Sequence, residues 1–563
     1  RLITGHYNLT ISQINVKLKN VPKIAQKRES EHMYRIKTYR LTAIATLIFF
    51  VSSLIRPPYA HAFDLTTWTT GGTQLGSTGV DDGIKHEPQQ EAANNCKHQG
   101  KPVNVHTGEE TFVCQDLFIP GRGIDLEIQH IYQSGYHSNS QFGYGWSLNY
   151  YKRLHTLSNG NVMIVSGAGR KDEYTANGGG SYLPPPGFFE SLVQNGDGTW
   201  TLTKAQGDKE HFDMNGALSS VEDRKGNAIT LLYDAGGLLP IVGVSPYTQV
   251  AGERVVVGYD YRLIKMTDTV GRDVDFTYDA DGRLQSMTDY TGRTLSYVYD
   301  AVTDDLLSIT KPATSQFPSG VTKTFTYDVD HNLVTITDAK GQTFVTNYYD
   351  ANGRVYQQDL GSGTMYFDFN TAGQTTFTDR KGFDTRYVFN AQGNVILEEK
   401  FTTGLRAGDP ASFISSYTYN GDMLKTSETY PQGNGLKFVY DENNADPRGR
   451  GNLLEVRRKT VMTAADDNAL DLVTTMTYEP LHNLVRSITD PKGNVTLFVY
   501  DSDLPTNDPK YGTKGNLIRI QHSAVAVGTP ITEFSYNSFG QVVEAIDPNG
   551  NVTTYAYEPA TGY

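Results

Sequence analysis

The chain has 563 residues, a formal net charge of −13 and 20% charged residues. This acidic balance argues against a nucleic-acid-binding surface, which would need a basic stripe. The 55 glycines and 36 tyrosines are typical of many short strands joined by tight turns, so the composition predicts an all-β protein.

The N-terminal part of the chain predicts an export signal. Residues 1–32 precede the first plausible start, Met33, and we interpret them as an upstream extension without a fold. Residues 33–62 follow the order of a signal peptide: basic residues, the apolar run Leu41–Ile55 and a small-residue cleavage site that ends at Ala62. The alternative is a single membrane anchor, although this run is shorter than the roughly 20 residues that a span needs.

The next segment, residues 63–96, is rich in Gly, Thr and Gln and predicts a flexible linker. The chain has two cysteines, Cys96 and Cys114, and both follow the export signal. An even cysteine count in an exported chain favours a disulfide between them, and two free thiols are the alternative. Such a bond would stabilise the fold by about 3 kcal/mol in the chain-entropy model.

Residues 97–175 form a module with a different pattern. Apolar residues alternate along Ile124–Tyr132, which predicts a half-buried strand. We interpret Trp146 as a core aromatic rather than a ligand-stacking residue, because aromatic side chains dominate protein cores. Residues 176–222 continue as short strands and turns, and we interpret them as a β-rich connection.

One unit then recurs over residues 223–563. Tyr278-Asp279 opens a copy, and Tyr299-Asp300 closes it 21 residues later. Two alternating runs, Leu284–Thr288 and Thr294–Tyr299, each follow a turn of the form Asp-x-x-Gly, so the unit is a β-hairpin. A lone hairpin is marginal in water, and stacked hairpins therefore predict one continuous spiralling sheet.

The repeated aromatic–acid pair marks the phase of the repeat. The tyrosines that we interpret as structural repeat anchors are Tyr233, Tyr259, Tyr278, Tyr299, Tyr327, Tyr349, Tyr440, Tyr500, Tyr536 and Tyr557. The glycines that we expect to end the turns are Gly226, Gly282, Gly292, Gly341, Gly353, Gly382, Gly493 and Gly550. Truncating one buried anchor is expected to cost about 3–5 kcal/mol, so these residues are structural rather than ligand-binding.

Two of these patterns resemble a known family. Tyr-Asp, then Gly-Arg/Asn-Leu, then Ile-Thr-Asp-x-x-Gly-Asn-x-Thr, resembles the RHS/YD repeat, over residues 223–563. Pro102–Gly108, Phe118–Gly121 and Gly143–Ser147 look like the module that precedes RHS repeats. The resemblance implies that the repeats form part of a hollow β-cocoon, a shell that encloses a C-terminal toxin domain. The family's autoproteolytic segment has no matching positions here, so no catalytic residue is carried over.

The motifs of common enzymes do not occur, and the aspartates of the turns are accounted for by capping those turns, so we expect no enzyme, cofactor or metal site. We therefore expect a structural shell region of an exported bacterial RHS-repeat protein, secreted or at the cell surface. Its partner would be its own C-terminal toxin domain, absent here. The alternative is a cell-surface adhesion protein that binds carbohydrate, and a degenerate cell-wall hydrolase is disfavoured.

Overall fold

The computed structural model describes residues 103–234, 247–250, 253–256, 262–361, 363–403, 406–466, 468–525 and 528–558. The upstream extension, the signal peptide with Ala62, the linker, Cys96 and the anchor Tyr259 lie outside the described residues. The disulfide and the signal peptide therefore stay predictions. Within the described ranges, no helix is long and apolar enough to cross a membrane.

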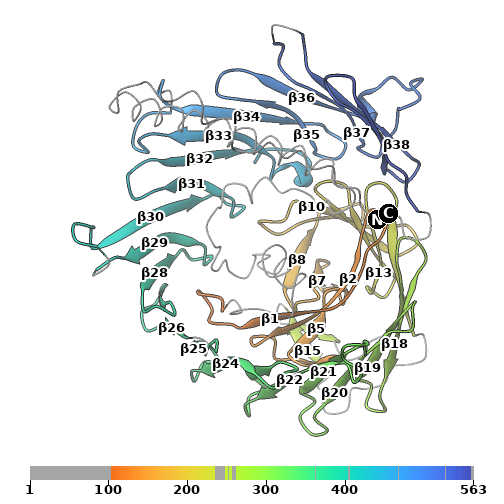
Figure 1. Ribbon diagram of the computed structural model, residues 1–563, viewed down its shortest axis with the longest axis vertical. Helices are drawn as coiled ribbons and strands as arrows, with labels where there is room; N and C mark the ends of the chain where they lie inside the picture. Colours follow the sequence, from red (N-terminus) through yellow and green to blue (C-terminus); the bar gives the residue numbers. More distant parts are fainter. Residues whose placement is uncertain are drawn as a thin grey trace, which may run out of the picture. The chain divides into compact units, whose positions relative to one another are not determined.

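Nearly all regular structure is β, which confirms the predicted fold class. Thirty-three strands form one antiparallel sheet, in which successive strands pair in sequence order (Figure 1). The two runs expected inside one repeat are β19 (Leu284–Asp289) and β20 (Thr294–Tyr299). The residues of β20 are alternately exposed and buried from Thr294 to Tyr299, because successive side chains of a strand point to opposite faces.

The sheet begins with a closed ring of strands. The Leu154 N–H donates to the Gly216 carbonyl at 2.8 Å, and an isolated bridge joins Arg153 to Ala217, so the first strand of the ring meets the last. The ring strands are β6 (Arg153–Thr156), β7 (Val162–Val165), β8 (Lys171–Ala176), β9 (Ser181–Leu183), β10 (Glu190–Gln194), β11 (Trp200–Lys204), β12 (Lys209–Phe212) and β13 (Leu218–Glu222).

The repeats continue the same sheet from β13. Their strands up to residue 389 are β14 (Ala228–Tyr233), β17 (Leu263–Thr267), β18 (Asp273–Tyr278), β19, β20, β21 (Leu306–Lys311), β22 (Val321–Tyr327), β23 (Leu333–Thr337), β24 (Thr343–Tyr349), β25 (Val355–Asp359), β26 (Thr364–Asp368), β27 (Gln374–Thr378) and β28 (Asp384–Phe389). A separate hairpin, β15 (Tyr247–Val250) with β16 (Glu253–Val256), lies between β14 and β17 in the chain.

The later repeats follow without a break in strand order. Their strands are β29 (Val395–Phe401), β30 (Ser412–Tyr419), β31 (Lys425–Thr429), β32 (Gly435–Tyr440), β33 (Leu453–Lys459), β34 (Leu472–Tyr478), β35 (Val485–Thr489), β36 (Val495–Tyr500), β37 (Leu517–Gln521), β38 (Ile531–Tyr536), β39 (Val542–Ile546) and β40 (Val552–Thr554). Two short 3-10 helices, η3 (Pro447–Gly449) and η4 (Asp501–Asp503), interrupt the connections.

The module forms a three-stranded sheet of its own, in the order β1 (Thr111–Ile119), β2 (Leu126–Gln133) and β5 (Trp146–Leu148), beside the short pair β3 (Asn139–Ser140) and β4 (Gly143–Tyr144). The expectation that the strand in Ile124–Tyr132 is half-buried was wrong. Both faces of β2 are buried, because Ile131 packs with Val113 and Ala168 on the side away from the repeats.

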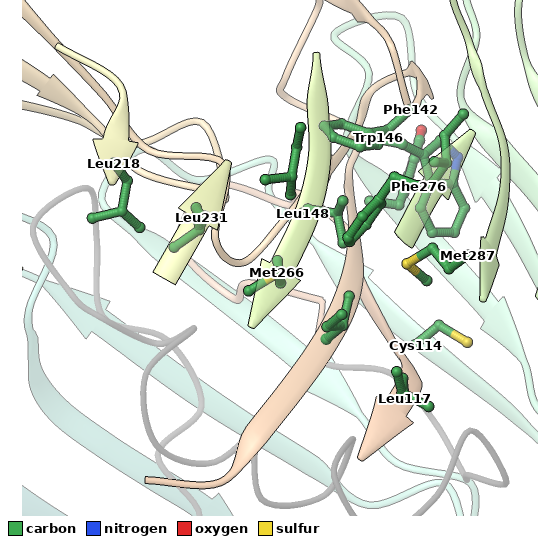
Figure 2. Packing of buried hydrophobic residues seen from close by; sticks show 14 of the residues in the cluster. Cys114, Leu117, Phe142, Trp146, Leu148, Leu218, Leu231, Met266, Phe276 and Met287 are labelled. Atoms are coloured by element: carbon green, nitrogen blue, oxygen red, sulfur yellow. The ribbon is translucent and has the colours of Figure 1, made fainter. Parts of the chain in front are cut away.

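The main hydrophobic core joins the module to the ring and the earlier repeats. Figure 2 labels members of it from each part. The labelled residues are Cys114, Leu117, Phe142, Trp146 and Leu148 of the module and Leu218, Leu231, Met266, Phe276 and Met287 of β13, β14, β17, β18 and β19. The module is therefore part of the core of the repeat sheet rather than a separate domain beside it.

Candidate functional site: the anchor face and its cover

Most of the described anchors make the same cross-strand hydrogen bond. Tyr278 lies at a β-bulge, where the register with β19 shifts and places it opposite Leu284. Its Oη donates to the carbonyl of Leu263, the first residue of the preceding strand, at 2.9 Å. Equivalent bonds of 2.7 to 3.0 Å join Tyr233 to Leu218, Tyr327 to Leu306, Tyr349 to Leu333, Tyr419 to Val395, Tyr440 to Lys425, Tyr478 to Leu453, Tyr500 to Val485, Tyr536 to Leu517 and Tyr557 to Val542. The anchors thus act as cross-strand staples.

The anchor Tyr299 departs from this pattern. Its hydroxyl is buried and has no hydrogen-bond partner among the described residues. At the start of the preceding strand, the N–H of Leu284 donates to the Gln141 carbonyl of the module at 2.7 Å. Burial raises the pKa of the Tyr299 phenol well above its usual value, so it remains protonated.

The turns carry the second repeated feature. Asp279 Oδ1 accepts the N–H groups of Asp281 and Arg283 at 3.0 and 2.8 Å, so the carboxylate is used within its own turn. The predicted turn glycines all have φ between 71° and 88°, a conformation that glycine adopts without steric cost. These are Gly226, Gly282, Gly292, Gly341, Gly353, Gly382, Gly493 and Gly550. Within the part of the chain that the structure describes, no group of three His, Cys, Asp or Glu residues could hold a metal ion.

We call the face of the repeat sheet that carries Leu295, Tyr297 and Tyr299 in β20, and the equivalent residues in other strands, the anchor face. The module covers it over β20 to β23. Trp146 is fully buried, and its Nε1 donates to the anchor Tyr327 Oη at 2.8 Å. Tyr132 Oη accepts the N–H of Leu333 at 2.9 Å. Trp146 is therefore a core residue that fixes the module to an anchor.

A buried polar cluster that the sequence did not reveal lies under this cover. Asp116 of β1 accepts a hydrogen bond from Tyr297 Oη at 2.8 Å and pairs with His130 Nδ1. Burial, together with the negative charge of Asp116, raises the pKa of the Tyr297 phenol. The His130 and Asp116 side chains are fully buried, so no substrate could reach them, and we interpret the cluster as a structural joint. The alternating run placed His130 on the apolar side, which was the only signal of its burial.

The cover continues toward β28 as the chain is followed back to residue 103. Gln358 Nε2 of β25 donates to Glu110 at 3.0 Å. The N–H of Val355 donates to the Gly108 carbonyl at 2.8 Å. Val103 and Val105 are buried against Tyr387 and Phe389 of β28 in a second hydrophobic cluster. The described residues of the module thus continue the cover of the anchor face from the core shared with β14 to β19 as far as β28.

The anchor face of the later repeats is different. All the residues of β31, β35 and β39 are half-buried, and Phe413 of β30 is exposed. A smaller core, formed by Phe438, Tyr440, Leu453 and Met476, lies on β32 to β34. Charged side chains also lie on this face, since Tyr417 Oη donates to Glu398 at 3.1 Å and Lys425 lies over the Tyr417 ring. This part of the anchor face therefore carries both apolar and charged side chains.

Comparison with known families supports this organisation. The model described as RHS Repeat matches residues 278–316 and 313–343, which include three of the anchors. The chain contains RHS repeats. A second model, described as Domain of unknown function (DUF6531), matches residues 100–174, which are nearly all of the module and include β6, β7 and most of β8 of the ring. The repeat phase read from the aromatic–acid pairs therefore coincides with the repeats of a known family.

Curated relatives and solved structures resemble parts of this RHS-repeat protein. The tRNA nuclease WapA of Bacillus subtilis (strain 168) and the tRNA(Glu)-specific nuclease WapA of Bacillus subtilis subsp. natto (strain BEST195) are each 29% identical over 135 residues, 23% of this chain and 6% of theirs. The crystal structure of TcdB2-TccC3-Cdc42 has a TM-score of 0.41 and 12% identity over 84% of this chain and 22% of that one. The structure of the Photorhabdus luminescens Tc holotoxin pore has a TM-score of 0.38 and 13% identity, and the match covers 80% of this chain and 22% of that one.

Proposed function

We propose that this chain is the non-catalytic shell region of an exported bacterial RHS-repeat protein, and that the shell encloses a toxin domain encoded beyond Tyr563. The contrast between the covered and uncovered parts of the anchor face carries the proposal. The module covers this face from β20 to β28, whereas the described residues leave it half-buried on β31, β35 and β39. A face that combines apolar and charged groups suits contact with another polypeptide segment.

The WapA relatives suggest a class of activity for the enclosed toxin domain. Both are described as tRNA nucleases, and the present chain matches only 6% of their length. The match therefore leaves most of these nucleases without a counterpart among the residues of the present chain. In the present protein the proposed role of the described repeats is to shield a cargo, and export would depend on the signal peptide predicted for residues 33–62.

Protease protection tests the shell. The chain is extended by the residues that its gene encodes after Tyr563, and a specific protease site is inserted in that extension. A matched control carries the same site in the linker, residues 63–96. The proposal predicts that the control is cut rapidly and that the downstream site resists until the repeats are unfolded. Equal cutting of both sites would contradict enclosure, and so would a gene that ends in repeats or an anchor.

A second candidate function, cell-surface adhesion through carbohydrate, is favoured by one exposed patch. Tyr348, Tyr356 and Tyr366 of β24 to β26 are all exposed, and the first two rings have centroids 6.4 Å apart. Tyr348 and Tyr366 both lie opposite Gln357, so they share a face of the sheet. Tyr348 Oη also donates to Asp359 at 3.2 Å, so the patch combines aromatic rings with a carboxylate that can accept hydrogen bonds.

A glycan array distinguishes this second function from the first. The chain and the variant with Y348A, Y356A and Y366A are compared, and F401A serves as a matched control, because Phe401 is similarly exposed on another strand. Binding that the triple substitution abolishes and F401A leaves unchanged would support adhesion. Identical glycan binding by all three proteins would contradict adhesion through this patch.

A further inference from the structure

Two turns that are far apart in the sequence meet without pairing their strands. The first is the turn Asp223–Gly226 between β13 and β14, and the second is the turn Asn537–Gly540 between β38 and β39. Lys225 Nζ donates to the Gly540 carbonyl at 2.7 Å across 315 residues of sequence. Asn227 Nδ2 donates to the Phe539 carbonyl at 3.2 Å. We call this turn-to-turn contact the seam.

Glycine makes the close approach at the seam possible. A Cβ on Gly540 would lie 2.2 Å from Cδ of Lys225, which is closer than real contacts allow. A second contact of this kind lies nearby, where a Cβ on Gly207 would lie 2.5 Å from His482 Nδ1. By contrast, Gly226 and Gly493 face open space within 4 Å, although they have the same backbone conformation. The seam glycines therefore serve packing as well as turn geometry.

A loop of the module, Pro120–Gly123, holds the seam from the side. The Arg122 N–H donates to Thr269 Oγ1 at 2.6 Å, and its Nη2 donates to the Thr269 carbonyl at 3.0 Å. Its Nε donates to Asn227 Oδ1 at 3.1 Å, and its guanidinium lies 3.6 Å from the centroid of the Phe539 ring. Arg122 therefore contacts three turns at once, and one of them belongs to the last described repeats.

We propose that Arg122 is a latch that holds the later repeats against the start of the sheet, and that its release opens the seam before any strand ladder breaks. The seam is held by side chains and turns, whereas every strand of the repeats is held by a ladder of backbone bonds. Local openings involve the regions with the fewest such contacts first. Arginine suits this position, because its planar fork can bind two acceptors while it stacks on an aromatic ring.

The consequence for function depends on the proposed shell, whereas the latch itself does not. If the repeats enclose a cargo, an opening at the seam separates the turn between β38 and β39 from the turn between β13 and β14 without unfolding these strands. The seam would then be the place where the enclosure yields. If the repeats enclose nothing, the same contact would still control how the two ends of the sheet part, and its release would be measurable in the chain alone.

Hydrogen exchange measured by mass spectrometry tests the latch in the full chain. R122A is compared with R122K and with R519A, a matched control whose guanidinium binds Glu533 on β38 at 2.8 Å. The latch predicts that R122A accelerates exchange at residues 223–227 and 537–541 by about tenfold, equivalent to about 1.4 kcal/mol of opening free energy. The exchange rate of R122K is expected to lie between those of R122A and the unsubstituted chain, since lysine keeps the charge but lacks the planar guanidinium that binds two acceptors and stacks on the ring.

A second variant distinguishes the loss of the latch from a general loss of the fold. F539L removes the other half of the stacking pair at an exposed position, and the latch predicts the same localised acceleration. Equal exchange in R122A and R519A, or an acceleration spread evenly over β19 to β23, would overturn the latch. R122A could open locally while the downstream protease site is cut as fast as the control site. That pair of results would support the latch and contradict the proposed shell.

Discussion

The earlier and later repeats have the same sequence pattern but different surroundings. Ile336-Thr337-Asp338 of β23 and Ile488-Thr489-Asp490 of β35 are copies of one motif, and both isoleucines lie between paired strands. Ile336 is fully buried under the module, whereas Ile488 is half-buried. The difference arises from what covers the anchor face, since the strands themselves are equivalent. The repeat therefore makes the sheet, and the module closes the core over the part of the sheet that it covers.

The largest expected effect compares these two isoleucines. I336A should lower the free energy of unfolding by about 3–4 kcal/mol, because it leaves a cavity in a closed core. I488A should cost about 1–2 kcal/mol, since its surroundings already admit solvent and can relax. Chemical denaturation of both variants measures the two losses. Equal losses would mean that the two halves are covered alike.

The contact between the two halves should respond to pH. Burial, assisted by the charge of Arg224, lowers the pKa of Lys225 to about 8 from its usual 10.5. The folded state then binds fewer protons than the unfolded state between these values, so stability should rise as pH increases from 8 to 10.5. The gain is at most about 3 kcal/mol. Thermal unfolding measured over this pH range should show the gain in stability in the unsubstituted chain. The K225M variant should lose the part of the gain that Lys225 contributes.

The anchors offer a smaller test of the cover. The Tyr327 hydroxyl both donates to Leu306 and accepts from Trp146, whereas the Tyr500 hydroxyl donates to Val485 alone. Y327F should therefore cost about 2–3 kcal/mol, because it leaves the buried Trp146 N–H without its acceptor, and Y500F about 1 kcal/mol. Urea unfolding of the pair measures the gap. A cost for Y500F that matches or exceeds that of Y327F would contradict the covering role of Trp146.

The smallest effect should be the same in both halves. Gly341 and Gly493 end equivalent turns at φ of 75° and 82°, and both face open space. G341A and G493A should each cost about 1 kcal/mol through backbone strain alone. Unequal costs, measured by the same denaturation experiment, would show that the turns themselves differ and would weaken the comparison of the two isoleucines.

The local part of this fold could be predicted from the sequence. The aromatic–acid pairs and the Asp-x-x-Gly turns predicted strands such as β19 and β20 to within one residue, because turn capping and alternation are local. The burial of β2 on both faces could not be predicted, since Ala168, which covers its second face, is 37 residues from Ile131 in sequence.

The long-range part depends on features that no local pattern contains. The approach of Lys225 to Gly540 depends on the twist and bend added by every strand and bulge between them, and small differences accumulate over that distance. The role of Arg122 was hidden for the same reason. Its neighbours Phe118–Gly121 were singled out as a family motif, but nothing in the sequence indicated that the next residue reaches Phe539.

Thiol labelling at the two matched isoleucines measures whether a downstream segment covers the later repeats. I336C and I488C are made in the chain that ends at Tyr563 and in the protein extended by the residues encoded downstream, and the unsubstituted chain gives the background from Cys96 and Cys114. We expect the position-336 thiol to be unreactive in both proteins. The position-488 thiol should react in the shorter chain and be protected in the extended one. Equal reactivity of the position-488 thiol in both proteins would contradict the claim that the later repeats enclose a cargo.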